Sequence, residues 1–193
     1  YRNLGGWKFE EVSTQAGVDA AAWGNGVCAG DADGDGRLDL YVTNWGPNSL
    51  FRNRGDGTFE EIAPRAGVTA GGWSTGCAFL DADADGDLDL YVARYVETTW
   101  DEVVRAQRTF VWRNGPRGMV GPVGLRGEAD LFFENLGQGR FRDATAASGL
   151  TDAARAYAAQ KHPGATSFEE LHAHDYLMYA YLQTAQDDKA RQI

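Results

Sequence analysis

The 193-residue chain has no long apolar run, few cysteines and a deficit of positive charge. No stretch reaches the about 18 apolar residues of a membrane-spanning helix, so we expect no membrane insertion. Two cysteines are too few for a disulfide framework. Lys and Arg number 18 against 28 Asp and Glu, which gives a formal net charge of −10. Because phosphate binding requires a basic surface, we expect no nucleic-acid partner.

Each cysteine lies shortly before one of two aspartate-rich segments, which begin at Asp31 and Asp81. The distance from the cysteine to the segment is similar in the two cases but not identical. Two residues separate Cys28 from the first segment and three separate Cys77 from the second. Because side chains alternate along a strand, this offset turns the thiols to opposite faces of equivalent strands. We therefore expect buried free thiols, with a disulfide bridge as the alternative.

What the chain has in abundance is clustered aspartate. The segment "DADGDGRLDLYV" begins at Asp31, and "DADADGDLDLYV" begins at Asp81. Together they hold nine of the 28 acidic residues. Charge gathered this tightly predicts a bound cation. The nine residues are Asp31, Asp33, Asp35, Asp39, Asp81, Asp83, Asp85, Asp87 and Asp89.

An internal repeat with a period of 50 residues contains both acidic segments. Residues 1–18 align with 51–68, and 22–44 align with 72–94, without gaps. A third copy of the first piece occurs at 133–150, displaced by 82. The additional 32 residues fall between about 95 and 128, in an insert rich in Gly, Pro and Arg that we expect to form a surface excursion.

The repeat predicts a mainly β fold. In each copy a short Gly- and Ala-containing strand leads into the acidic loop, and "LDLYV" forms the next strand. Two more strands follow and are joined at Asp56-Gly57. Asp-Gly between two strands indicates a hairpin, because both central residues of the favoured turn need positive φ. Four short strands per repeat suit a β-propeller blade better than a βαβ unit. Residues 1–150 therefore predict a partial β-propeller of about two and a half four-stranded antiparallel blades.

The β pattern ends at Leu150, and residues 151–193 predict an α-helical hairpin. This segment is rich in alanine and has no β-branched run. Ser167 and Glu170 form a capping box directly after the break at Pro163-Gly164. The sequence "HPG…SFEELHAHDYLMYAYLQTAQDDKA" resembles a helix-turn-helix unit of the tetratricopeptide type.

The acidic loops have the chemistry of a hard-cation site. Aspartates occupy positions 1, 3, 5 and 9 of each loop, and Gly36 or Gly86 at position 6 permits a sharp bend. The backbone carbonyls of Arg37 and Asp87 at position 7 add an oxygen. Calcium takes six to eight oxygens in such irregular geometry, and the absence of histidine and cysteine from the loops disfavours zinc. We therefore predict two Ca²⁺ sites.

An EF-hand and a metal-free turn are the two other interpretations of the loops. An EF-hand requires a bidentate Glu at position 12 and a helix on each side, whereas these loops have Val42 or Val92 there and a strand follows. An Asp/Gly turn without metal would use aspartate only for side-chain turn bonds. Two copies with every acidic position filled favour the metal.

These motifs, followed by "FRNRGDGTFEEIAPRAGV", resemble the FG-GAP or VCBS repeats that build calcium-binding propellers in integrin α-subunits and secreted bacterial proteins. The passage "GPRG…LFFENLGQGRFRDATAASGL" is most similar to a cartilage-acidic-protein-like bacterial group. The resemblance covers residues 1–150 and implies structural calcium. The ligands it implies are Asp31, Asp33, Asp35, the Arg37 carbonyl and Asp39, and Asp81, Asp83, Asp85, the Asp87 carbonyl and Asp89.

The third copy departs from the pattern, since no acidic loop follows Leu150. A closed ring at this period needs on the order of 300 residues, and open strand edges are normally avoided. We therefore expect a fragment or a fusion, with further blades missing from this chain. A short propeller-like assembly capped by helices is the alternative.

We expect a binding module and no enzyme, because no catalytic or phosphate-binding motif is present. In the insert, Trp100, Arg108, Trp112 and Arg113 form a candidate ligand face, since aromatic and arginine side chains dominate binding hot spots. The expected partner is a protein or a carbohydrate, in an extracellular or periplasmic setting where calcium is plentiful. The alternatives are a non-catalytic scaffold of a larger secreted enzyme and part of a tetratricopeptide-type peptide-binding protein.

Overall fold

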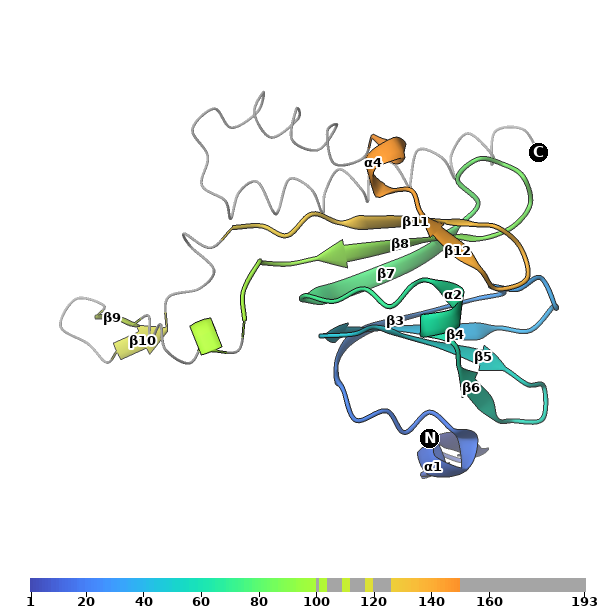
Figure 1. Ribbon diagram of the computed structural model, residues 1–193. Coiled ribbons are helices and arrows are strands. Elements are labelled where there is room, and N and C mark those ends of the chain that lie inside the picture. Colours follow the sequence, from blue (N-terminus) through green and yellow to red (C-terminus); the bar gives the residue numbers. More distant parts are fainter. Residues whose placement is uncertain (100, 104–108, 112–116, 120–125, 150–193) are drawn as a thin grey trace, which may run out of the picture. The chain divides into compact units, whose positions relative to one another are not determined.

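The computed structural model of the chain describes residues 1–99, 101–103, 109–111, 117–119 and 126–149 (Figure 1). It forms two units, Tyr1–Ala93 with Asp130–Ala144, and Arg94–Ala129 with Thr145–Ile193. The predicted helical hairpin at 151–193 lies outside the described residues, as do the four candidate ligand residues of the insert. Among the described residues, no helix has the length and apolar character needed to cross a membrane.

The first four-stranded sheet of the first unit confirms the predicted blade pattern. Strands β3 (Trp23–Gly30), β4 (Asp39–Trp45), β5 (Ser49–Asn53) and β6 (Phe59–Glu61) follow one another in space in chain order. Every neighbouring pair is antiparallel. The chain is thus mainly β, with a sheet of the kind found in propeller blades.

The hairpin between β5 and β6 is present, but its geometry differs from the predicted two-residue turn. Gly55 and Gly57 have φ values of 81° and 86°, while Asp56 does not have positive φ. Asp56 instead accepts a hydrogen bond at 2.9 Å from the backbone N–H of Thr58. The two glycines, rather than the Asp-Gly pair, therefore supply the left-handed backbone of the turn.

The second four-stranded sheet is assembled across the insert. Its order is β12 (Phe141–Asp143), β11 (Leu131–Asn135), β8 (Asp89–Arg94) and β7 (Ser74–Leu80). Strands β7 and β8 come from the second repeat, and β11 and β12 come from the third copy. The 82-residue displacement of that copy therefore reflects a long insertion between the second and third strands of one sheet.

The remaining described elements are short. Hairpin strands β1 (Arg2–Gly5) and β2 (Lys8–Glu10) precede helix α1 (Ser13–Ala16), and helix α2 (Ala63–Ala66) follows β6. The repeated sequence "AGV" ends both helices, because Gly17 and Gly67 take left-handed φ values of 74° and 81° at the C-caps. These single-turn helices were not predicted from the sequence.

The second unit begins where the insert leaves the sheet. Val96 and Gly127 form an antiparallel bridge, and the N–H of Glu97 donates to the Arg126 carbonyl at 2.8 Å. An ion pair joins Arg94 to Glu128 beside them. Further along the insert β9 (Thr109–Val111) pairs with β10 (Arg117–Met119). The unit also contains α4 (Thr145–Ser148).

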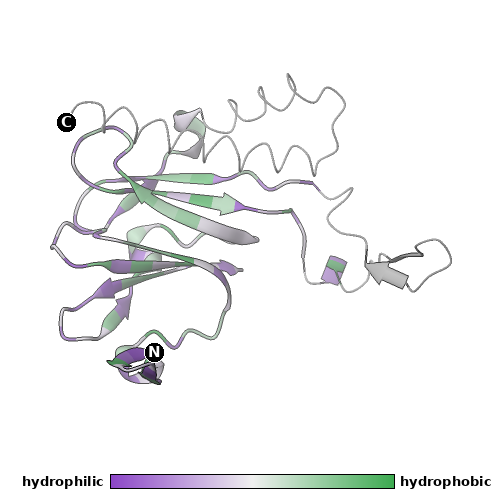
Figure 2. Cartoon of the chain, turned by 180° about the vertical axis from the view of Figure 1, so that it is seen from behind, coloured by the Kyte–Doolittle hydropathy of each residue, from purple (hydrophilic) through white to green (hydrophobic). Residues whose placement is uncertain are grey.

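The core of the first unit lies among the strands of the two four-stranded sheets, whose apolar stretches are evident in Figure 2. Leu50, Leu90 and Val92 are fully buried in it. In β4 the buried face carries Tyr41 and Thr43, whereas Leu38, just before the strand, is 62 % exposed. The alternation in "LDLYV" therefore places tyrosine and polar side chains inward in this sheet.

A buried polar network accompanies this inward tyrosine. The Tyr41 hydroxyl donates to the carbonyl of Val68 at 2.9 Å and accepts from Nδ2 of Asn48 at 3.0 Å. The same Asn48 amide donates to Oγ of Ser74 at 3.0 Å. Because Ser74 opens β7, the network fastens the first sheet to the second.

The two cysteines are free and half-buried. Cys28 on β3 and Cys77 on β7 are in hydrogen-bond contact, and both pack against the core of the first unit. That hydrogen bond and burial together raise the pKa of the Cys28 thiol. Sγ of Cys77 also lies 3.5 Å from the Tyr41 carbonyl.

Candidate metal centres

Both acidic segments occupy the same place in their sheets, as the connection between the first and second strands. Residues 31–38 join β3 to β4, and residues 81–88 join β7 to β8 (Figure 1). The repeat in sequence is thus a repeat in structure, and two chemically similar loops have equivalent settings.

Asp31 organises the first loop by accepting backbone hydrogen bonds. Its Oδ1 accepts from the N–H groups of Gly34 and Asp35 at 2.9 and 3.0 Å, and its Oδ2 accepts from Gly36 at 2.8 Å. Gly34 and Gly36 have positive φ, which lets the backbone wrap around the carboxylate. The glycine expected at position 6 therefore performs the predicted bend.

The last aspartate of each loop ties the loop to the third strand. Asp39 is 1 % exposed, and its carboxylate accepts from the N–H groups of Ala32 at 3.1 Å and Asn53 at 2.8 Å. Asp89 accepts equivalently from Ala82 at 3.0 Å and Asn135 at 2.9 Å. Burial raises the pKa of both carboxyls, and the backbone hydrogen bonds oppose that rise.

Two asparagines that the sequence analysis did not single out complete this tie. Nδ2 of Asn53 donates to the Leu38 carbonyl at 3.1 Å. Nδ2 of Asn135 donates to the Leu88 carbonyl at 2.9 Å and to the Ala32 carbonyl at 3.1 Å, so it links both loops. The repeat could have revealed these asparagines, because the sequences "YRN", "FRN" and "FEN" end in asparagine at equivalent positions of the three copies.

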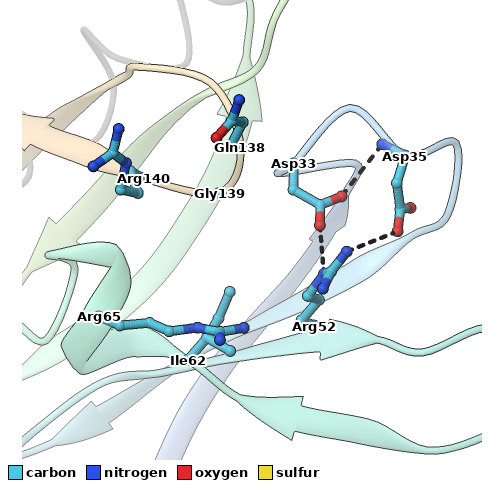
Figure 3. Close-up of a pocket in the computed structure, with 8 residues that line it drawn as sticks. All are labelled: Asp33, Asp35, Arg52, Ile62, Arg65, Gln138, Gly139 and Arg140. Carbon is cyan, nitrogen blue, oxygen red and sulfur yellow. Dashed lines mark hydrogen bonds and ion pairs between the residues drawn. The ribbon is translucent and has the colours of Figure 1, made fainter.

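Two arginines pair with the aspartates of the first loop. Nε of Arg52, on β5, lies 2.5 Å from Oδ2 of Asp33, and its Nη2 lies 3.4 Å from Oδ2 of Asp35 (Figure 3). Nη1 of Arg37 lies 2.8 Å from the same Asp35 oxygen. Arg37, predicted to contribute only its carbonyl, therefore also pairs through its side chain. Sequence reasoning missed Arg52, which lies outside the loop.

The second loop differs in charge. Glu134 of the second sheet stands where the first sheet has Arg52, and it pairs with Arg142 at 2.5 Å. Asp87 stands where the first loop has Arg37. One buried carboxylate oxygen of Asp87 accepts no hydrogen bond from the described residues. Burial, a hydrogen bond with Asp85 and the neighbouring carboxylates raise the pKa of Asp87 to about 6.

Part of each predicted ligand set is clustered tightly enough to hold one ion. Each of Asp31, Asp33 and Asp39 brings an oxygen within 4.8 Å of the others. Asp81, Asp83 and Asp85 do the same in the second loop. In the first loop Asp35 turns to the arginines and is not in the cluster. An all-carboxylate donor set suits a hard cation such as calcium.

A family model described as the FG-GAP-like repeat matches residues 1–42 and 31–92 of this chain. Those residues include both acidic loops, and the match supports an FG-GAP repeat protein. No curated protein matches the chain.

Proposed function

We propose that the chain is a calcium-stabilised FG-GAP repeat module that serves recognition or scaffolding outside the cytoplasm. The observation that supports this most directly is a carboxylate cluster in each of two equivalent loops, formed by Asp31, Asp33 and Asp39 in the first and by Asp81, Asp83 and Asp85 in the second. FG-GAP repeats are typical of extracellular or surface proteins, where calcium concentrations suit weak structural sites. Kinship with VCBS and integrin-like propellers belongs to the same proposal.

The charge of the second loop gives the physical reason for a divalent cation. Five aspartates lie within nine residues, and burial, the hydrogen bond with Asp85 and the neighbouring carboxylates together raise the pKa of Asp87. A calcium ion would be held by the side chains of Asp81, Asp83, Asp85 and Asp89 with the Asp87 carbonyl. It would supply the positive charge that Arg52 and Arg37 supply in part to the first loop.

We assign no catalytic role to these carboxylates. Asp39 and Asp89 are buried and hold backbone N–H groups, which is a structural task. The partner in this proposal is a protein or a carbohydrate, contacted in part by Trp100, Arg108, Trp112 and Arg113 of the insert. There are two alternatives. In one, the sheets are the non-catalytic scaffold of a larger secreted enzyme. In the other, the chain is part of a tetratricopeptide-type peptide-binding protein.

The test is thermal unfolding with calcium titrated into calcium-free protein, against a magnesium series. At 100 times the dissociation constant, each site that binds only the native state adds about 2.7 kcal/mol to the unfolding free energy. Asp33→Asn and Asp83→Asn should each lose part of the calcium effect. Asp56→Asn is the matched control, because Asn keeps the acceptor for Thr58 outside the loops. A response to magnesium equal to that for calcium, or none to either, would refute the proposal.

A further inference from the structure

A cleft of about 460 Å³ lies beside the first acidic loop. Asp33 and Asp35 form one side of it, and Arg52 and Arg65, from β5 and α2, form another (Figure 3). The turn between β11 and β12, at residues 138–140, closes the third side. The volume is within the range of about 300–1,000 Å³ that is usual for small-molecule sites.

The third side of the cleft is held in place by close packing. A Cβ at Gly139 would lie 3.2 Å from Cβ of Asp33, so this turn packs directly on the loop. Gln138 and Gly139 have φ values of 58° and 67°, and the N–H of Leu136 donates to the Arg140 carbonyl at 2.8 Å. The turn and the acidic loop therefore lie in direct contact at this edge of the cleft.

The lining carries three arginines against two aspartates, in a chain with a net charge of −10. Arg52 is committed to Asp33 and Asp35. Arg65 has one ion pair, at 3.4 Å to Glu60, and Glu60 is shared with another arginine. Arg140 is exposed and has no ion-pair partner among the described residues. The guanidinium of Arg140 thus remains available to an anion, and that of Arg65 is held only by one exposed pair to Glu60.

The repeat fold does not require these arginines. The equivalents of Arg52 and Arg65 are Glu134 and Ala147 in the third copy of the repeat piece, and Arg2 and Gln15 in the first. The hairpin and single-turn helix form in all three copies. The hairpin and helix therefore form in the other copies without this pair of arginines.

We propose that this cleft binds a carboxylate group of an acidic ligand, held by Arg65 and Arg140 and positioned by Arg52. A guanidinium matches a carboxylate in a planar, two-point hydrogen bond, and exposed arginine side chains reorient readily toward a ligand. The carboxylate belongs either to a sugar acid or to a glutamate side chain. The proposal rests on the recognition role but does not depend on bound calcium.

The experiment titrates two matched probe pairs into the protein and follows backbone and arginine Nε–H resonances by NMR. One pair is methyl glucuronide and methyl glucoside, and the other is N-acetyl-glutamate amide and N-acetyl-glutamine amide. Each titration is run in calcium-free buffer and with calcium chloride. The variant Arg65→Gln/Arg140→Gln is compared with Arg2→Gln/Arg142→Gln, which removes the same charge from surface arginines outside the cleft.

We expect at least one carboxylate probe to bind while its neutral counterpart does not, and the pair that responds identifies the source. The cleft variant should weaken binding about tenfold or more, and the control variant should not. Arg140→Gln alone should weaken binding without lowering the melting temperature. Binding in calcium-free buffer supports the cleft even if the unfolding experiment shows no calcium effect. Equal binding of acidic and neutral probes in both buffers, or an equal loss in the control variant, would overturn it.

Discussion

Nε of Arg52 lies 2.5 Å from Oδ2 of Asp33, across 19 residues of sequence. This contact gives the first loop a positive charge that comes from the third strand of its own sheet. The second loop has Glu134 at the equivalent position, and that side chain turns to Arg142. Two loops of nearly the same sequence therefore differ in how their carboxylates are neutralised.

The first prediction follows from this asymmetry. Arg52→Gln should lower the unfolding free energy of the calcium-free protein by about 0.5–1 kcal/mol, the value of a partly exposed ion pair. Calcium should reduce the difference, because the ion takes over the neutralisation of Asp33. Thermal unfolding with and without calcium measures both effects. Arg54→Gln, which breaks a 3.7 Å surface pair, is the control. An equal loss in both buffers would contradict the interpretation.

The second prediction concerns the pH dependence of the calcium-free protein. Asp87 has a pKa of about 6 in the folded state against an ordinary value of 3.8. The folded state therefore binds more protons than the unfolded state between about pH 4 and 6, and this residue lowers stability as pH rises through that window. Asp87→Asn should make the decline shallower in urea unfolding at several pH values. Identical pH profiles for the variant and the wild type would count against the raised pKa.

The third prediction distinguishes the two asparagines of the repeat. Asn135 is 5 % exposed and its amide serves two carbonyls, so Asn135→Ala should cost about 1–3 kcal/mol. Asn53 donates to one carbonyl in an exposed setting, so Asn53→Ala should cost less. Urea unfolding of the two variants gives the comparison directly. A larger loss at Asn53 would show that the link between the loops is unimportant.

The fourth prediction concerns the thiols between the sheets. Because burial and the contact with Cys77 raise the pKa of Cys28, little thiolate is present at neutral pH. A disulfide-exchange reagent should react slowly with the folded protein and rapidly after denaturation. Cys77→Ala should speed the reaction of Cys28, because it removes the partner in that hydrogen bond. Fast reaction of both thiols in the native protein would contradict this arrangement.

The sequence predicts much of the β structure because the repeat carries both the strand pattern and the turns. The alignment of 72–94 with 22–44 locates β7 and β8, and the third copy locates β11 and β12. The expectation of positive φ at Asp56 is wrong, because glycines on both sides of it provide the turn. Helices α1 and α2 escape prediction because one helical turn is too short to show a 3.6-residue period.

The acidic loops were recognisable because their chemistry is local. The groups that neutralise and anchor them were not, because Arg52 and Asn135 reach them from other strands. Only the pairing of β4 with β5 and of β8 with β11 brings these side chains to the loops. The contact between Gly139 and Asp33 depends further on how the two sheets stack, which no single repeat encodes.

The central claim is that the chain has two calcium sites, one in each loop. Equilibrium dialysis with radioactive calcium measures their number directly. We expect two ions bound per wild-type chain, one in Asp33→Asn, one in Asp83→Asn, and two in the control Asp56→Asn. Excess magnesium should leave these numbers unchanged. No calcium bound to folded wild-type protein, or two ions retained in both loop variants, would contradict the account.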